Sequence, residues 1–298
     1  MVVVSWNMAK SKSIPIEQVL KHCERWGASL LLIQEPTGSL LHFGSSRKES
    51  QARGCESSWR GHLYKGGSQG SIVIVSRKGV TVSHLEGIDL GVGQGTRRIT
   101  ATNPLVLFDA QEGDERLKIG TCHAPYDSGA RSQYARNAVA QGSAKRAHCV
   151  IGDMNTYGTG TPGRTSTRGG SGYQTPSLGA TSNKGAGSPL DKAYVADSIG
   201  TSFQAGRIVP GPSSSNVKAS PGGCDQVADI VDPDWKECQS DHLPIYMAFY
   251  DQVDRVQDFS KKRDREDDED SDDMDSPPAK RPKLKEPNQG GGSRTIKT

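Results

Sequence analysis

The chain has 298 residues, 33% of them hydrophobic and 24% charged, with 37 Lys and Arg against 34 Asp and Glu. This length allows one large domain or two small ones, and the net charge of +3 is too small to identify a nucleic-acid partner by itself. The sequence has no apolar run near the ~20 residues that cross a bilayer and no N-terminal signal peptide, so we expect neither an integral membrane protein nor export by the general secretory route.

The first half of the chain predicts strands that alternate with helices. Val2–Ser5 begins with three valines, and Leu30–Ile33 is apolar throughout, as in a strand buried on both faces. Between them, apolar residues recur at helical spacing from Ile16 to Trp26. Further strands are predicted at Ser71–Ser76, Val80–Val82, Ile99–Phe108, Leu117–Thr121 and Cys149–Ile151, with a helix from about Arg131 to Lys145 before the last of them.

The second half is richer in glycine, serine and threonine. Residues 156–188 contain nine glycines, which predicts a long mobile loop. Gln226–Val231 and Pro244–Tyr250 supply the last predicted strands. The order of the elements therefore predicts an α/β layered domain with mixed sheets and no regular βαβ alternation.

The C-terminal segment differs in composition from the rest. Residues 261–298 hold ten basic and ten acidic residues in separate blocks, one at Asp264–Asp275 and one at Lys280–Lys285. Since such a segment has too few apolar residues to offset chain entropy, we predict a domain over residues 1–252 and a disordered tail over residues 253–298. Residues 278–285 are similar to a monopartite nuclear localisation signal, which predicts a nuclear import receptor as partner and the nucleus as location; a plain solvated tail is the alternative.

Polar residues follow the predicted apolar strands at six places. An acid after a strand is usually a turn residue or a helix cap, and a single histidine there is usually structural. Six such places in one chain favour a shared cleft at the sheet edges, where loops present functional side chains. The places are Trp6-Asn7, Gln34-Glu35, Cys122–Asp127, Gly152–Asn155, Asp225 and Ser240–His242.

The residue types at these places suit phosphoester chemistry. Glu35 and Asp241 are hard oxygen ligands of the kind that Mg²⁺ takes, one or two at a time, while it keeps several waters. His123 and His242 carry imidazoles, a group whose ordinary pKa lies near neutral pH, so they suit an acid and a base. The remaining members are Asp225, a candidate to fix the tautomer of His242, and the carboxamides Asn7 and Asn155, which can bind phosphate or orient a ligand.

In this order the motifs resemble those of the endonuclease/exonuclease/phosphatase superfamily. The most specific are Gly152-Asp153-Met154-Asn155 and Ser240-Asp241-His242-Leu243-Pro244, and the resemblance covers residues 2 to about 250. Within the superfamily, the short His123–Asp127 segment is similar to that of pancreatic-type deoxyribonucleases and of the cytolethal distending toxin B subunit. The resemblance implies a four-layer α/β sandwich of two packed mixed sheets flanked by helices.

The resemblance also implies a role for each matching residue. Glu35 is then the principal Mg²⁺ ligand, assisted by Asn7 and Asp241, with Mn²⁺ or Ca²⁺ as substitutes. Asp153 orients the attacking water, Asn155 holds the scissile phosphate, and His123 and His242 supply proton transfer and phosphate contact, His242 being paired with Asp225. The interval from Asp225 to Asp241 is short for the family, so Asp191 is the alternative partner, and the phosphate-contacting arginines are assigned to Arg97 or Arg98.

These features lead to a Mg²⁺-dependent phosphodiesterase that hydrolyses DNA, of the endonuclease type and genotoxin-like. One alternative is an inositol phospholipid phosphatase, which would use the same site and make a phosphoinositide the partner. The other is a nuclear binding module that keeps the fold without turnover. We expect a monomer, with delivery subunits a further alternative that the sequence leaves open.

Overall fold

The computed structural model describes residues 1–8, 14–66, 71–90, 103–125, 128–156 and shorter stretches up to residue 249. Those stretches are 172–176, 178, 181, 190–199, 203–210, 229–232, 240 and 242–249. All of them belong to one compact unit, Met1–Lys261. The predicted tail and its boundary at residue 252 lie outside the described residues.

Among the described residues, one sheet has eight strands in the order β13-β12-β14-β1-β2-β5-β4-β3. Its centre consists of β1 (Val2–Asn7), β2 (Leu30–Gln34) and β5 (Ile72–Arg77), where β1 runs parallel to β2 and β2 antiparallel to β5. The other strands are β3 (Glu49–Ser50), β4 (Trp59–Tyr64), β12 (Phe203–Pro210), β13 (Ile230–Asp232) and β14 (Ile245–Phe249).

The second sheet has six strands in the described part of the chain, in the order β10-β11-β9-β8-β7-β6. Only the central pair β8 (Glu115–His123) and β9 (Cys149–Asp153) is parallel, so this sheet is mixed too. The remaining strands are β6 (Val80–Ile88), β7 (Leu105–Glu112), β10 (Tyr173–Gln174) and β11 (Asp191–Ala196), which is followed by the 3-10 turn Asp197–Ile199.

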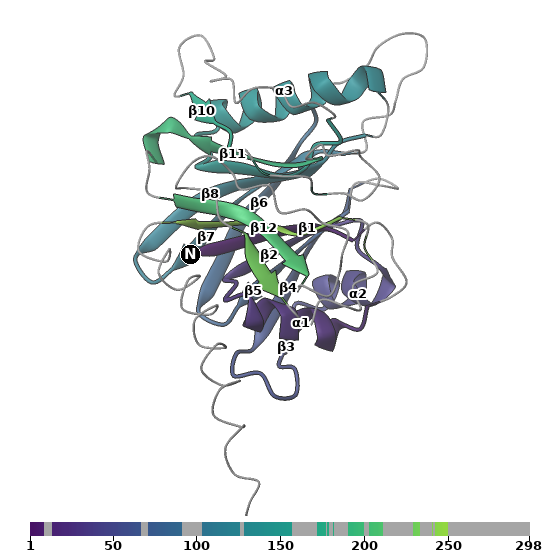
Figure 1. Ribbon diagram of the computed structural model, residues 1–298. Helices are drawn as coiled ribbons and strands as arrows, with labels where there is room; N and C mark the ends of the chain where they lie inside the picture. Colours follow the sequence, from purple (N-terminus) through teal and green to yellow (C-terminus); the bar gives the residue numbers. More distant parts are fainter. Residues whose placement is uncertain are drawn as a thin grey trace, which may run out of the picture. The chain divides into compact units, whose positions relative to one another are not determined.

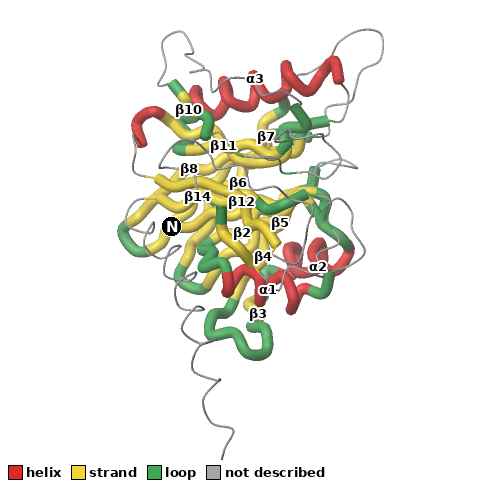
Figure 2. The backbone as a smooth tube through the Cα atoms, in the orientation of Figure 1, coloured by secondary structure: helices red, strands yellow, loops and turns green. Residues whose placement is uncertain are grey.

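The two sheets stack on each other and helices cover their outer faces (Figures 1 and 2). Helices α1 (Ile16–Arg25) and α2 (Gly38–Ser46) lie on the eight-stranded sheet, and α3 (Ser128–Ala144) lies on the six-stranded one. Side chains alternate along the central strands: Leu32 packs in the core between the sheets, while Leu31 and Ile33 pack in the core that includes α1. This arrangement is the predicted four-layer α/β sandwich.

The apolar strands and the two predicted helices are present close to their expected bounds, because a continuous apolar run fits a central strand with cores on both faces. The strand expected at Ile99–Phe108 lies further along, at Leu105–Glu112, and the one expected at Gln226–Val231 is described as Ile230–Asp232. The sequence pattern does not predict α2, β4, β11 and β12. Each of these contains glycine, serine or charged residues that weaken the apolar pattern.

No helix within the described ranges is long and apolar enough to cross a membrane.

Candidate active site

Strand register brings the site residues to one edge of the two sheets. On the six-stranded sheet, His123 pairs with Asp153 and Asp153 pairs with Asp191, so all three side chains lie abreast on the same face. On the eight-stranded sheet, Asn7 pairs with Gln34, which places Glu35 at the end of the neighbouring strand. Residues far apart in the sequence therefore meet where β1, β2, β8 and β9 end and β11 begins.

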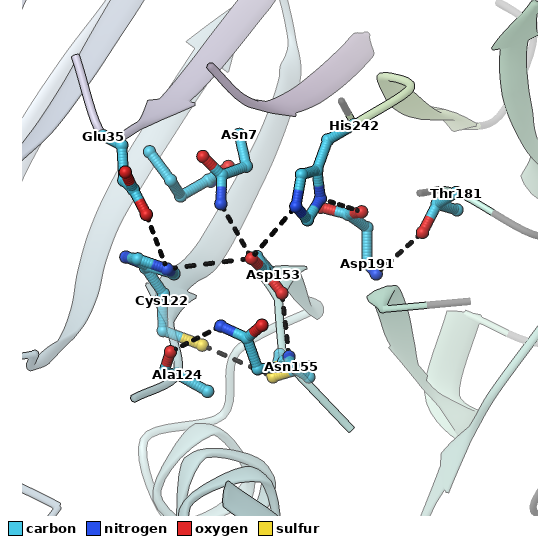
Figure 3. Close-up of polar contacts among 12 residues, drawn as sticks. Asn7, Glu35, Cys122, Ala124, Asp153, Asn155, Thr181, Asp191 and His242 are labelled. Carbon is cyan, nitrogen blue, oxygen red and sulfur yellow. Dashed lines mark hydrogen bonds and ion pairs between the residues drawn. The ribbon is translucent and has the colours of Figure 1, made fainter. Parts of the chain in front are cut away.

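Asp153 lies at the centre of these contacts (Figure 3). Its Oδ2 accepts a hydrogen bond from Nδ2 of Asn7 at 2.7 Å and lies 3.7 Å from Nε2 of His123 and 4.0 Å from Nε2 of His242. Its Oδ1 accepts the backbone N–H of Asn155 at 2.8 Å. Asp153 therefore contacts one amide and two imidazoles, and its hydrogen bond with Asn7 joins the two sheets.

His242 is held by a carboxylate on its other ring nitrogen. Nδ1 of His242 lies 2.9 Å from Oδ2 of Asp191, and both side chains are buried. Because an ionised carboxylate only accepts, Nδ1 carries the proton and Nε2 is left toward Asp153. The backbone beside His242 is fixed by Ser240, whose hydroxyl donates to the carbonyl of Asn7 at 2.7 Å and accepts the N–H of His242 at 3.1 Å.

Glu35 approaches His123 from the first sheet. Its Oε1 lies 3.3 Å from Nε2 of His123, and its side chain retains 20% exposure. The residue has a φ of 48°, so the chain leaves β2 in a left-handed turn that any non-glycine residue adopts only at some cost. Just before it, the buried Nε2 of Gln34 donates to Ser5 and to Thr121, each at 3.1 Å, and so ties β2 to its own sheet and to β8.

Burial and, next in size, the nearby charge of Asp191 raise the pKa of Asp153, while His123, His242 and the Asn7 hydrogen bond act in the opposite direction. The net result is a pKa of about 6. The site thus combines three carboxylates and two imidazoles, all of them buried except the partly exposed Glu35. A carboxyl group with a pKa near neutrality can hold or release a proton under physiological conditions, as perturbed groups at active sites often do.

Two backbone features shape the loop after β9. Gly152 approaches β8 so closely that a Cβ there would lie 2.1 Å from the carbonyl oxygen of Cys122. Asn155 has a φ of 47°, and its Nδ2 donates to the carbonyl of Ala124 at 2.8 Å. The Asn155 side chain is therefore held beside His123 and Asp153, with a second Nδ2 hydrogen remaining for a ligand.

The structure brings together six of the predicted site residues: Asn7, Glu35, His123, Asp153, Asn155 and His242. Their individual roles stay predictions. Asp225, Asp241, Arg97 and Arg98 lie outside the described residues, so the roles predicted for them remain predictions as well.

Three contacts differ from the sequence-based prediction. The carboxylate seen on His242 is Asp191, the alternative to Asp225. The sequence pattern does not predict the contacts of Thr181, which lies in a glycine-rich stretch, or the bridge from Gln34 to Thr121. Both join segments that only the tertiary structure brings together.

In the described part of the chain, Asp153, Asp191 and His242 form a group that could hold a metal ion, with one ligand atom from each residue and all three atoms within 4.8 Å of one another. All three residues are buried. The site therefore has both the charge and the ligand types that a divalent cation requires.

Comparisons with known proteins identify the fold. TDP2 from Caenorhabditis elegans superposes with a TM-score of 0.52 at 14% identity, over 84% of this chain and 97% of that one. An endonuclease/exonuclease/phosphatase family protein from Bacteroides thetaiotaomicron gives 0.52 at 12% identity, over 84% and 98% of the two chains. The endonuclease/exonuclease/phosphatase from Bacteroides vulgatus gives 0.53 at 12% identity, over 83% and 98%.

No protein-family model and no curated protein sequence matches the chain. The chain thus has the endonuclease/exonuclease/phosphatase fold, which confirms the resemblance predicted from the sequence motifs at the level of the fold. The closer resemblance to the cytolethal distending toxin B subunit and pancreatic-type deoxyribonucleases stays a prediction.

Proposed function

We propose that this chain is a Mg²⁺-dependent phosphodiesterase that hydrolyses DNA by attack of water on a phosphodiester. The observation that carries the proposal is a meeting of side chains from both sheets: Asn7, Glu35 and His242 come from the strands and strand ends of the eight-stranded sheet, and His123, Asp153 and Asp191 from the six-stranded one. Acids, bases and oxygen ligands within hydrogen-bonding reach of one another are the groups that hydrolysis of a phosphoester uses.

The donor set fits a hard divalent cation. Glu35 offers a partly exposed carboxylate and Asn7 an amide oxygen, on neighbouring strands and at the same edge. Mg²⁺ takes one or two protein carboxylates and keeps several waters, so these two residues, with Asp241 as the further ligand we propose, are sufficient. When bound, the ion supplies charge stabilisation for the phosphodiester and its leaving oxygen.

The protein's own groups account for proton transfer. Asp153 is held by Asn7 and by the backbone of Asn155, so its carboxylate is fixed for a water that approaches the phosphate. His242, oriented by Asp191, presents Nε2 to the same region and can accept or return a proton. His123 and Asn155 contact the phosphate from the β8 and β9 side.

DNA is favoured over a lipid headgroup by the sequence motifs and by the basic segment at residues 278–285, which fits import into the nucleus. We propose a catalytic domain over residues 1–252 and a targeting tail over residues 253–298. The phosphoinositide alternative becomes an outcome of the test.

The test incubates the purified full chain with supercoiled plasmid, with Mg²⁺ and with excess chelator. The proposal expects relaxed and linear plasmid only when Mg²⁺ is present. A parallel arm measures phosphate released from short-chain phosphoinositides. Full cleavage in excess chelator would overturn the metal dependence, and phosphate release without plasmid cleavage would assign the lipid substrate instead.

A further inference from the structure

Thr181 forms hydrogen bonds with the backbone of Asp191 and with that of Leu243, the residue next to His242. Its buried Oγ1 accepts the N–H of Asp191 and the N–H of Leu190, each at 3.0 Å (Figure 3). Its carbonyl oxygen accepts the N–H of Leu243, the residue after His242, at 2.7 Å. A single residue from between β10 and β11 therefore binds the segment that carries the carboxylate and the segment that carries the imidazole.

The Thr181 hydroxyl accepts hydrogen bonds from two backbone N–H groups at the end of the sheet. Asp191 is the first residue of β11, and Leu190 lies just before it, so their N–H groups lie at the end of the sheet. Buried N–H groups need an acceptor, and an unsatisfied one costs about 1–3 kcal/mol. Thr181 satisfies both N–H groups with one oxygen, which fixes the backbone from which the Asp191 carboxylate extends.

The Asp191 carboxylate forms few other hydrogen bonds with the described residues. Oδ1 of Asp191 is buried, and no residue in the described part of the chain forms a hydrogen bond with it. Within the described part of the chain, the side-chain hydrogen bond of its Oδ2 is the one with His242. The direction of the Asp191 side chain thus depends on its backbone, and a small displacement there would lengthen the 2.9 Å contact with Nδ1 of His242.

We propose that Thr181 is a positioning residue, whose hydroxyl holds Asp191 at the distance and angle that fix the Nδ1-protonated tautomer of His242. The effect on turnover rests on the proposed phosphodiesterase function, whereas the effect on the tautomer is independent of it. Supporting shells of this kind decide whether an acid–base pair is held tightly enough to act.

The test compares Thr181→Val with Thr181→Ser in the full chain. Valine keeps the shape and the carbonyl contact with Leu243 but removes the acceptor oxygen, and serine restores it. In protein with ¹⁵N-labelled histidine, Thr181→Val should shift the ring nitrogens of His242 away from the single Nδ1-protonated tautomer, and Thr181→Ser should return them. Plasmid cleavage should fall about tenfold in kcat with little change in KM for Thr181→Val, and should recover for Thr181→Ser.

Ser29→Ala is the matched control. Ser29 is also buried, and its Oγ accepts the N–H of Val2 at 3.1 Å and donates to Glu112 at 2.7 Å, at the far end of β2 from Glu35. It should lower stability by a similar amount and leave the His242 signals unchanged.

Unchanged His242 signals in a folded Thr181→Val protein would overturn the proposal and leave Thr181 a purely structural residue. If Thr181→Val does not fold, Thr181→Cys, with a weaker acceptor of similar size, gives the same comparison. If the wild-type chain cleaves no plasmid, the proposed function fails, while the His242 signals still decide the role of Thr181.

Discussion

At the scale of single residues, Glu35 is the group on which metal binding depends in our proposal. Glu35→Gln keeps the size and removes the charge, so we expect plasmid cleavage at saturating Mg²⁺ to fall by at least about 10²-fold. The melting temperature should stay close to that of the wild type, because the side chain is partly exposed. The exposed Glu56→Gln is the control. Wild-type cleavage by Glu35→Gln would remove this residue from the metal site.

A second prediction concerns the carboxylate that orients His242. Asp191→Asn replaces an acceptor by a group that can donate, which favours the wrong tautomer, and turnover should fall by about 10²-fold or more. Asp225→Asn should cost less, since Asp191 already occupies Nδ1. Asp114→Asn, in the turn between β7 and β8, serves as the control. A larger loss for Asp225→Asn would return the orienting role to that residue.

At the scale of elements, the approach of β9 to β8 sets the distance between His123 and Asp153. A side chain at Gly152 would collide with the backbone of Cys122, and the register pair next to it is His123 and Asp153. Gly152→Ala should therefore lower the free energy of unfolding by about 2 kcal/mol or more. Urea unfolding of Gly152→Ala against Gly38→Ala, which has open space around it, measures this. Equal stability of the two variants would contradict the close contact.

The buried carboxylate of Asp232 in β13 forms hydrogen bonds with residues at the end of helix α1. Asp232 accepts hydrogen bonds from Nη1 of Arg25 at 2.9 Å and Nε1 of Trp26 at 2.8 Å, and Nδ1 of His22 lies 3.4 Å away. Burial alone would raise the pKa of Asp232, but the contacts with His22 and Trp26 and the charge of Arg25 lower it to about 2. The contribution to stability is therefore complete above pH ~4 and is lost as the pH falls through about 2.

The measurement is the difference in unfolding free energy between wild type and Asp232→Asn across this range. The difference should shrink by about 2 kcal/mol between pH 6 and pH 2. For the control Asp114→Asn, the difference in unfolding free energy from the wild type should be small and should not shrink by this amount between pH 6 and pH 2. A constant difference for Asp232→Asn would mean that the carboxylate gains nothing from these partners.

At the scale of the whole molecule, we propose that targeting and catalysis reside in separate segments. A chain ending at residue 252 should cleave plasmid as the full chain does. Residues 270–290 fused to a fluorescent reporter too large for passive entry should concentrate in nuclei, because an extended basic segment can bind an acidic receptor groove.

The control replaces Lys280, Arg281 and Lys283 by Ala in the same fusion, which should return the reporter to the cytoplasm. Nuclear accumulation of this variant would leave the basic cluster as a solvated tail. Loss of cleavage on truncation at residue 252 would place part of the catalytic domain in the tail.

The sequence alone was enough to predict the layers and most of the described residues that meet at the candidate site. Central strands such as Leu30–Gln34 lie between two cores, so they must be apolar throughout, and a polar residue directly after such a strand must emerge at the sheet edge. Glu35, His123 and Asp153 could therefore be found from the pattern, together with the fold that their motifs resemble.

Which groups contact one another follows from the folded arrangement and not from the sequence pattern. The pairing of His242 with Asp191, the bridge from Gln34 to Thr121 and the contact of Thr181 with Asp191 each join segments from different strands. Strand β11 begins with charged residues and escaped the apolar pattern, so nothing in the sequence placed Asp191 beside β9. Such contacts follow from sheet order and register, and these are set by packing over the whole domain, which local sequence does not encode.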